Sequence, residues 1–313
     1  MSKQVAGNDE ELAFYRMQSE ITRPGKYESR FGDLPTDISD LCLVIQNLLL
    51  HQFWIQDEKN YGITVESLKA RGRNLNHEIN IRTVEEKLDF LMKLEDRPLS
   101  GTRKADRRVL GNCRDYSVLL VSMLRYQGIP ARVRSGVARY FHPQEEKILD
   151  DHFICEFWDE SGERWQRADA QIDNVQQRVL QLHVDSTDLP PGHFLDGGES
   201  YYELMSGRVK PENVGIFEFR GWPYVHYKLI SDLANVNRME VLAWEGWGIC
   251  DRIDKKTLSQ EDHILLEKTA KILSTLSTDR GMFKKARHLF EKHPYLKVPK
   301  GYYPHYHELP FLN

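Results

Sequence analysis

The segment of residues 111–137 constrains the fold more than any other part of the chain. Asn112 is a favourable N-cap residue, and Asp115 stands three positions later, where an acidic side chain completes a capping box. The apolar residues that follow occupy too many faces for a surface helix, which predicts a largely buried helix that begins at Cys113. Gly128 ends this helix, and the next residues alternate between apolar and polar as in a β-strand. We therefore expect a buried helix, with a cysteine at its N-terminus, to lead directly into a sheet.

Two further strands, over residues 152–158 and 164–170, form a predicted hairpin around a polar turn. The length of the turn decides whether His152 and Asp169 meet. A two-residue turn makes them direct cross-strand partners, a four-residue turn leaves them diagonal on the same face, and a three-residue turn puts them on opposite faces. Two of these three geometries bring an imidazole and a carboxylate together.

A thiol, an imidazole and a carboxylate in this chain order can act as a nucleophile, its base and the group that orients the base. The amides and dipole at a helix N-terminus favour a thiolate and can lower the pKa of Cys113 below the usual ~8.5. Taken singly, Cys113 could simply pack in the core, and His152 could be a structural histidine. The helix start, the strand start and the hairpin register agree independently, which favours a site made by Cys113, His152 and Asp169.

The same segments resemble the transglutaminase-like superfamily, whose members have a papain-like Cys-His-Asp arrangement, and within it the bacterial-type single-chain members. In that pattern a Gly-x-Cys opens a helix that ends in Arg-x-x-Gly-Ile-Pro-Ala-Arg and leads into a strand. The resemblance covers about residues 80–175. The matching positions are Gly111, Cys113, Arg125, Gly128, Ile129, Pro130, Ala131 and Arg132, followed by His152, Glu156, Trp165 and Asp169.

This resemblance implies an α+β, papain-like core in which the helix that carries the cysteine packs on a small antiparallel sheet that carries the histidine and the aspartate. It also implies that Cys113 is the nucleophile, His152 the general base and acid, and Asp169 the orienting carboxylate. The chain departs from the pattern at Ile154, where Trp is frequent, and at Ala170, where Pro is frequent. These departures change the wall of the site rather than the triad. Because no calcium-site run of acidic residues is present, a calcium-dependent protein cross-linker is not expected.

The side chain that would stabilise an oxyanion is left open by the sequence. Asn47, Gln52 and Asn112 are candidates, and each could equally be a helix-surface or capping residue. Arg114 follows the cysteine directly and is a candidate contact for the substrate.

Composition limits the classes of protein that the chain can be. A hydrophobic fraction of 40% supports a real core, and a net charge of −4 does not suggest a nucleic-acid binder. The four cysteines are widely spaced, so we expect neither a disulfide framework nor a zinc site.

The polar N-terminus does not resemble a secretory signal and no apolar run approaches the ~20 residues of a membrane span, so we expect a cytoplasmic protein that does not enter membranes. A basic cluster precedes the cysteine and is either a solvated loop or a site for an anionic substrate: Arg103, Lys104, Arg107 and Arg108.

Three regions are expected along the chain. Residues 1–35 are predicted to form an irregular arm, residues 36–182 the catalytic core, and residues 183–313 a mostly helical extension that covers part of the cleft. Residues 56–82 are polar and ambiguous, and residues 183–221 are expected to form a long structured connection. Further helices are expected from Thr36, after Thr83, near residues 223–237, over residues 259–274 and over residues 279–293.

These features predict thiol-dependent amide chemistry through a thioester, without a cofactor or metal. The substrate would carry an amide or acyl group on a small molecule, a peptide or a carrier, and water or an amine could complete the reaction. A catalytically idle module that binds a peptide or protein partner is the alternative. A metal site at His305 and His307 is a third possibility, opposed by a C-terminal tail that simply packs. The sequence does not predict the oligomeric state.

Overall fold

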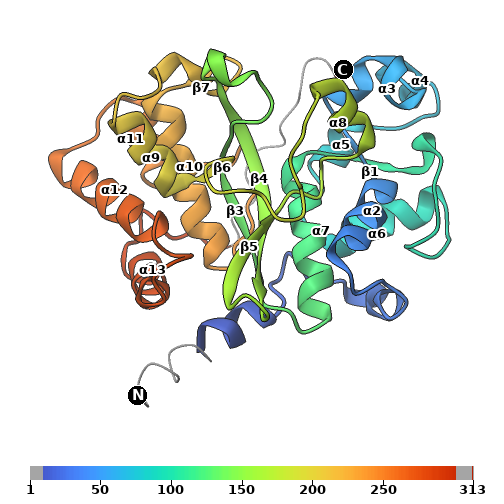
Figure 1. Cartoon of the computed structure of the whole chain (residues 1–313), viewed down its shortest axis with the longest axis horizontal. Helices are drawn as coiled ribbons and strands as arrows, with labels where there is room; N and C mark the ends of the chain where they lie inside the picture. Colours follow the sequence, from blue (N-terminus) through green and yellow to red (C-terminus); the bar gives the residue numbers. More distant parts are fainter. Residues whose placement is uncertain (1–9, 301–311, 313) are drawn as a thin grey trace.

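The computed structural model describes residues 10–300 and Leu312. A twisted, mixed sheet lies between two groups of helices, so that the chain has an α+β architecture (Figure 1). Three central strands form antiparallel pairs: β3 (Ala131–Ala138), β4 (Leu149–Asp159) and β5 (Arg164–Ala168). The sheet is completed by β6 (Phe194–Asp196), β7 (Val214–Ile216) and β8 (Phe219–Arg220), of which β7 is parallel to β4. The predicted fold class is confirmed.

The β4–β5 hairpin has the four-residue turn. Asp159 pairs with Arg164 and Cys155 pairs with Ala168, so the ladder ends one residue before Asp169. His152 and Asp169 are therefore diagonal neighbours rather than direct partners, as the longer of the two permissive turns predicts.

Helix α7 (Cys113–Tyr126) is the buried helix predicted from the sequence. The side chain of Asn112 accepts a hydrogen bond from the amide of Arg114, and that of Asp115 accepts one from the amide of Asn112 at 3.0 Å. The helix is buried from Cys113 through Arg125 and packs on β3 and β4. The sulfur therefore lies at the end of the helix where the backbone amides have no intrahelical partner.

A short parallel ladder was not anticipated by the sequence patterns. β1 (Leu49–His51) pairs with β2 (Val109–Gly111), and the amide of Gln52 donates to the carbonyl of Gly111 at 3.0 Å. This ladder holds the chain around Gln52 next to the start of α7. The flanking helices on this side of the sheet are α2 (Ile38–Leu48), α6 (Val84–Leu94) and α8 (Asn174–Leu180).

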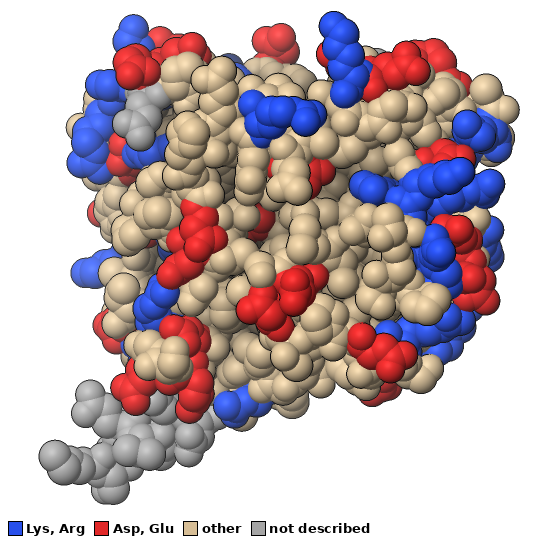
Figure 2. All heavy atoms as spheres, turned by 45° about the vertical axis from the view of Figure 1, so that its right-hand side comes forward, with Lys and Arg blue, Asp and Glu red and all other residues tan. Residues whose placement is uncertain are grey.

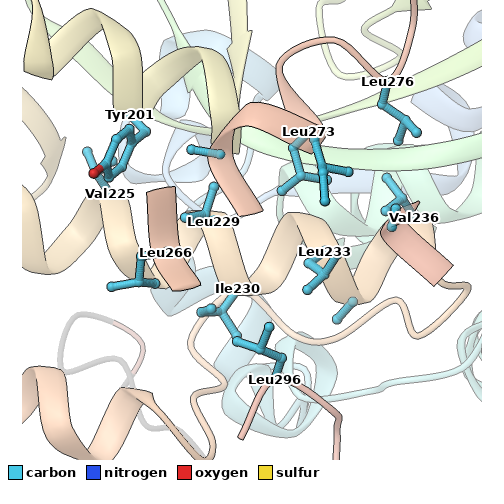
Figure 3. Packing of buried hydrophobic residues seen from close by; sticks show 14 of the residues in the cluster. Tyr201, Val225, Leu229, Ile230, Leu233, Val236, Leu266, Leu273, Leu276 and Leu296 are labelled. Carbon is cyan, nitrogen blue, oxygen red and sulfur yellow. The ribbon is translucent and has the colours of Figure 1, made fainter. Parts of the chain in front are cut away.

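The C-terminal helices cover the opposite side of the sheet (Figure 1). They are α9 (Gly197–Met205), α10 (Trp222–Val236), α11 (Cys250–Asp254), α12 (Gln260–Leu273) and α13 (Gly281–Lys292). Leucines of α10 and α12 meet in a large apolar cluster (Figure 3), where a fully buried side chain contributes roughly 1.5–3 kcal/mol. α10 also contacts β3 directly, which fixes its polar residues relative to the sheet.

One expectation about local structure needs correction, and two regions that the sequence left open are now defined. Residues 10–16 are helical and Gly25–Phe31 is a 3-10 helix (η1), so the described part of the N-terminal arm is not irregular. The ambiguous region contains η2 (Trp54–Gln56), α3 (Glu58–Tyr61), α4 (Val65–Lys69) and α5 (Leu75–Ile79). The long connection contains β6, α9, η5 (Pro211–Asn213), β7 and β8. Apart from α9, the elements named here have seven residues or fewer, so their apolar residues show no clear helical or strand periodicity in the sequence. The remaining 3-10 turns are η3 (Ala105–Arg107) and η4 (Gln144–Glu146).

The surface charges are mixed. Figure 2 shows acidic side chains among the basic ones on the face that it presents. Among the helices in the described part of the chain, none is both long enough and apolar enough to cross a bilayer.

Candidate active site

His152 and Asp169 are joined at the edge of the sheet. Nε2 of His152 lies 2.7 Å from Oδ2 of Asp169, and both side chains are only 1% exposed. The same oxygen accepts a hydrogen bond from the hydroxyl of Tyr140 at 2.7 Å, and Oδ1 accepts one from the amide of Gln171 at 3.0 Å. The carboxylate is thus held on both oxygens, and it fixes the orientation of the imidazole.

The charge state of His152 follows from its neighbours. Burial opposes a charge on the ring, but the Asp169 carboxylate and hydrogen bonds to Asp169 and Cys113 outweigh it and raise the pKa of His152 to about 10. Because Asp169 binds Nε2, Nδ1 is the ring nitrogen left for Cys113. The ring is therefore protonated at neutral pH, and its Nε2 is bound to the Asp169 carboxylate.

Cys113 differs from the other three cysteines in its surroundings. It lies at the N-terminus of α7 and lines a cavity of about 850 Å³ together with His152. All four cysteines are free thiols. Burial raises the pKa of Cys42 and of Cys250 to about 12 and raises that of Cys155, and none of these three lines the cavity. Only Cys113, among the described cysteines, combines access to a cavity with a neighbouring imidazole.

Two of the three predicted oxyanion donors lie at the cavity. Asn112 uses Oδ1 to cap α7, and its Nδ2 is buried with no hydrogen-bond partner among the described residues. Gln52 is also buried in the lining, and its Oε1 has no partner in the same part of the chain. An unsatisfied buried amide costs about 1–3 kcal/mol, so both side chains are in positions suited to a ligand.

The structure does not bring Asn47 or Arg114 to the cavity. Asn47 lies on α2, where Nδ2 donates to the carbonyl of Leu43 at 2.9 Å. The guanidinium of Arg114 is buried and donates to the carbonyls of Glu240 and Val241. Arg114 points away from the cavity because these distant carbonyls, which no local pattern reveals, satisfy its donors.

His51 is a cavity residue that the sequence analysis missed. It lies on β1, and Nδ1 accepts a 3.4 Å hydrogen bond from the amide of Phe53, which leaves Nε2 as the protonated nitrogen. Burial and then the charge of His152 lower the pKa of His51 to about 3, so the ring stays neutral. The only sequence signal was the apolar run before it, which did not indicate the ladder that brings it here.

A second missed group comes from α10. Lys228 forms an ion pair with Asp151, whose Oδ1 also accepts a hydrogen bond from the hydroxyl of Tyr224 at 2.8 Å. The Lys228 ammonium lies 4.1 Å from the centroid of the Phe153 ring. These residues give the cavity a buried charge pair next to the strand that carries His152.

Two members of the basic cluster before the cysteine bind backbone carbonyls. Arg103 is buried and donates to carbonyls of its own loop, while Arg108 reaches the carbonyls of Gln46 and Arg103. None of the four basic residues lines the cavity, so of the two alternatives the structure gives no support to an anionic site near the thiol. The described residues contain no group of three or more side chains able to hold a metal ion. His305 and His307 lie outside the described residues.

The chain has an α+β fold in which a cysteine at a helix N-terminus and a histidine on β4, which is hydrogen-bonded to Asp169, line the same cavity. Residues 81–170 match the model of the transglutaminase-like superfamily and form a domain of that superfamily. This match contains Cys113, His152 and Asp169.

No curated protein matches the chain. One solved structure, from Cytophaga hutchinsonii and described as a "putative cysteine protease", is similar at 15% identity with a TM-score of 0.29. The similarity covers 58% of this chain and 44% of that one, so the chain spans less than half of that protein.

Proposed function

We propose that the chain is an enzyme that cleaves or exchanges amide bonds through a thioester on Cys113. His152 is the general base and acid, and Asp169 is the orienting residue. The observation that carries this proposal is the position of His152, whose Nε2 is held 2.7 Å from Asp169 while its other nitrogen is left for Cys113. The protein would act in the cytoplasm, where its free thiols persist.

The first half-reaction follows from this arrangement. The Cys113 thiolate attacks the carbonyl carbon of an amide, a C–S bond forms, and the carbonyl π electrons move to oxygen. Amides of the first turn of α7, together with Nδ2 of Asn112 or Nε2 of Gln52, would stabilise that oxyanion. Nδ1–H of the His152 imidazolium then donates its proton to the leaving nitrogen as the C–N bond breaks. The products are a free amine and a thioester.

The second half-reaction regenerates the enzyme. Neutral His152 removes a proton from water or from an amine as that nucleophile attacks the thioester, and the sulfur leaves as a thiolate. Water makes the enzyme an amidase or peptidase, and an amine makes it an acyltransferase. The acyl group could be carried by a small molecule, a peptide or a carrier.

Selective alkylation tests the proposal. Iodoacetamide at neutral pH should label Cys113 at least tenfold faster than Cys42, Cys155 or Cys250, as measured by peptide mass spectrometry over time. His152→Ala should remove most of that advantage. Slow and equal labelling of all four thiols would instead support a module that only binds a peptide or protein.

A further inference from the structure

A strained phenylalanine lies at the edge of the cavity. We propose that Phe53 and Phe217 form an aromatic subsite that binds an uncharged, apolar or aromatic group of the substrate next to Cys113. This inference rests on the proposed function and names the chemistry of the substrate for the same site. Both rings lie outside the segment that matches the superfamily model.

The backbone at Phe217 is unfavourable for a bulky side chain. β7 and β8 pair Ile216 with Phe219, so Phe217 and Glu218 form a two-residue turn. Phe217 has φ +47°, a region that Gly and Asn enter far more readily than an aromatic residue. Phe217 is also 59% exposed, so its own burial does not offset that cost. The contacts of the Phe217 ring therefore explain this unfavourable backbone conformation better than the turn itself does.

Phe217 contacts a ring from the other half of the chain. Its centroid lies 5.5 Å from that of Phe53 with the planes at 89°, an edge-to-face pair. Phe53 in turn lies 5.4 Å from the ring of His51. All three rings line the cavity that contains Cys113. A continuous aromatic wall therefore runs from the hairpin tip toward the neighbourhood of His152.

The hairpin is anchored to the strand of the site. β7 pairs in parallel with β4, with Leu149 opposite Val214 and Asp150 opposite Gly215. Gly215 has φ +145°, and a Cβ there would lie 2.3 Å from the carbonyl oxygen of Phe219. The sequence thus requires glycine for the hairpin to close. The position of the Phe217 ring is tied through β4 to that of His152.

Apart from Glu218, which is exposed at the tip of the β7–β8 hairpin, the charged residues of the lining already have partners within the protein. A ligand that enters this cavity meets matched charges and aromatic faces, which favours an uncharged group over an ionic one. The matched sets are Asp151 with Lys228, Asp150 with His142 and Arg220, and Glu245 with Arg82.

The test compares three alkylating probes on the whole chain. The probes are iodoacetamide, its N-phenylethyl derivative and its cationic N-aminoethyl derivative. The rate at which each probe alkylates Cys113 is divided by the rate at which the same probe alkylates glutathione. We expect the phenylethyl probe to exceed iodoacetamide by about tenfold after this correction, with saturation at high concentration.

Variants distinguish an effect of the Phe217 ring on binding from an effect on folding. Phe217→Asn suits the positive φ but lacks the ring, so it should keep or raise the melting temperature while the aromatic preference falls to near one. Phe53→Ala should reduce the preference in the same way, and Phe217→Tyr should retain it. Tyr295→Ala, which removes an exposed ring outside the cavity lining, is the matched control and should leave the ratio unchanged.

The outcomes are distinguishable. Selective labelling of Cys113 without an aromatic preference, or with a cationic one, would overturn the subsite and leave the proposed function intact. A preference that survives in folded Phe217→Asn and Phe53→Ala would also overturn it. An inert Cys113 would remove the proposed function and the subsite with it.

Discussion

Tyr140 and His152 bind the same oxygen of Asp169, each at 2.7 Å. The hydroxyl of Tyr140 therefore shares this oxygen with the imidazole, and it helps to hold the carboxylate that orients the ring in place. Burial and the neighbouring Asp169 raise the pKa of Tyr140 well above its usual value, so the hydroxyl remains a donor throughout the working pH range.

Tyr140→Phe removes this donor and keeps the ring. A hydrogen bond to a charged group is worth about 1.5–3 kcal/mol. Without it, the Asp169 carboxylate should be held less firmly and should orient the imidazole less well. We expect the alkylation rate of Cys113 at pH 7 to fall by roughly tenfold. Tyr126→Phe, near the far end of α7, is the control and should leave the rate unchanged. An unchanged rate in Tyr140→Phe would show that the remaining bond from Gln171 suffices.

The sequence predicted the elements that are marked by local chemistry. Thr83 with Glu86 and Ser259 with Asp262 form the capping boxes that the spacing indicated, and α6 and α12 begin directly after Thr83 and Ser259. Asn112 and Asp115 do the same for α7. Caps are read from residues three positions apart, so they need no knowledge of the tertiary structure.

Long-range contacts account for what the sequence did not reveal. His51 reaches the cavity only because β1 pairs with β2, and each of these strands has three residues. Phe217 and Lys228 arrive from segments that follow the superfamily match. Such positions depend on pairing between distant segments rather than on local periodicity.

The raised pKa of His152 makes stability depend on pH. Its value in the folded chain, about 10, lies above the ordinary value of 6.5, so folding favours the protonated ring. That contribution is fully present below pH 6.5 and is lost as the pH rises through about 10. Urea unfolding of the wild type at pH 6, 8 and 10 should therefore show a steady loss of stability, roughly a few kcal/mol in total.

His152→Gln provides the comparison for that pH series. It cannot take up the proton, so its stability should decline less between pH 6 and pH 10 than that of the wild type. Parallel curves for the two proteins would mean that the proton on His152 is not linked to folding.

Asn112 and Gln52 can be separated as oxyanion donors. Asn112→Ser keeps a good N-cap and removes the amide, so stability should change by less than about 1 kcal/mol. If Nδ2 stabilises the oxyanion, the thiol-dependent hydrolysis of p-nitrophenyl acetate should fall by roughly 10²-fold. Gln52→Ala, measured in parallel, tests the other amide. A loss in Gln52→Ala with none in Asn112→Ser would assign the role to Gln52.

Glu156 is the centre of a buried charge network, and its removal should be costly. Its carboxylate accepts hydrogen bonds from Arg132 at 2.7 Å, Arg134 at 3.1 Å and Arg167 at 3.1 Å. Burial opposes its charge, but these three guanidinium groups hold the pKa of Glu156 well below its usual value. Glu156→Gln removes the carboxylate that all three guanidinium groups share. Each keeps another carboxylate, which is Glu11 for Arg132, Asp232 for Arg134 and Glu199 for Arg167, so we expect a loss near the lower end of the range for a broken buried ion pair, about 3 kcal/mol in chemical denaturation.

The exposed Glu212→Gln is the matched control for Glu156→Gln and should stay within about 0.5 kcal/mol of the wild type. The pH dependence has the opposite sign to that of His152. Because folding lowers the pKa of Glu156, its contribution is present above the ordinary value of 4.5 and is lost as the pH falls through the lower folded value. Wild type and Glu156→Gln should therefore converge in stability in strong acid, and a constant difference down to pH 2 would contradict this account.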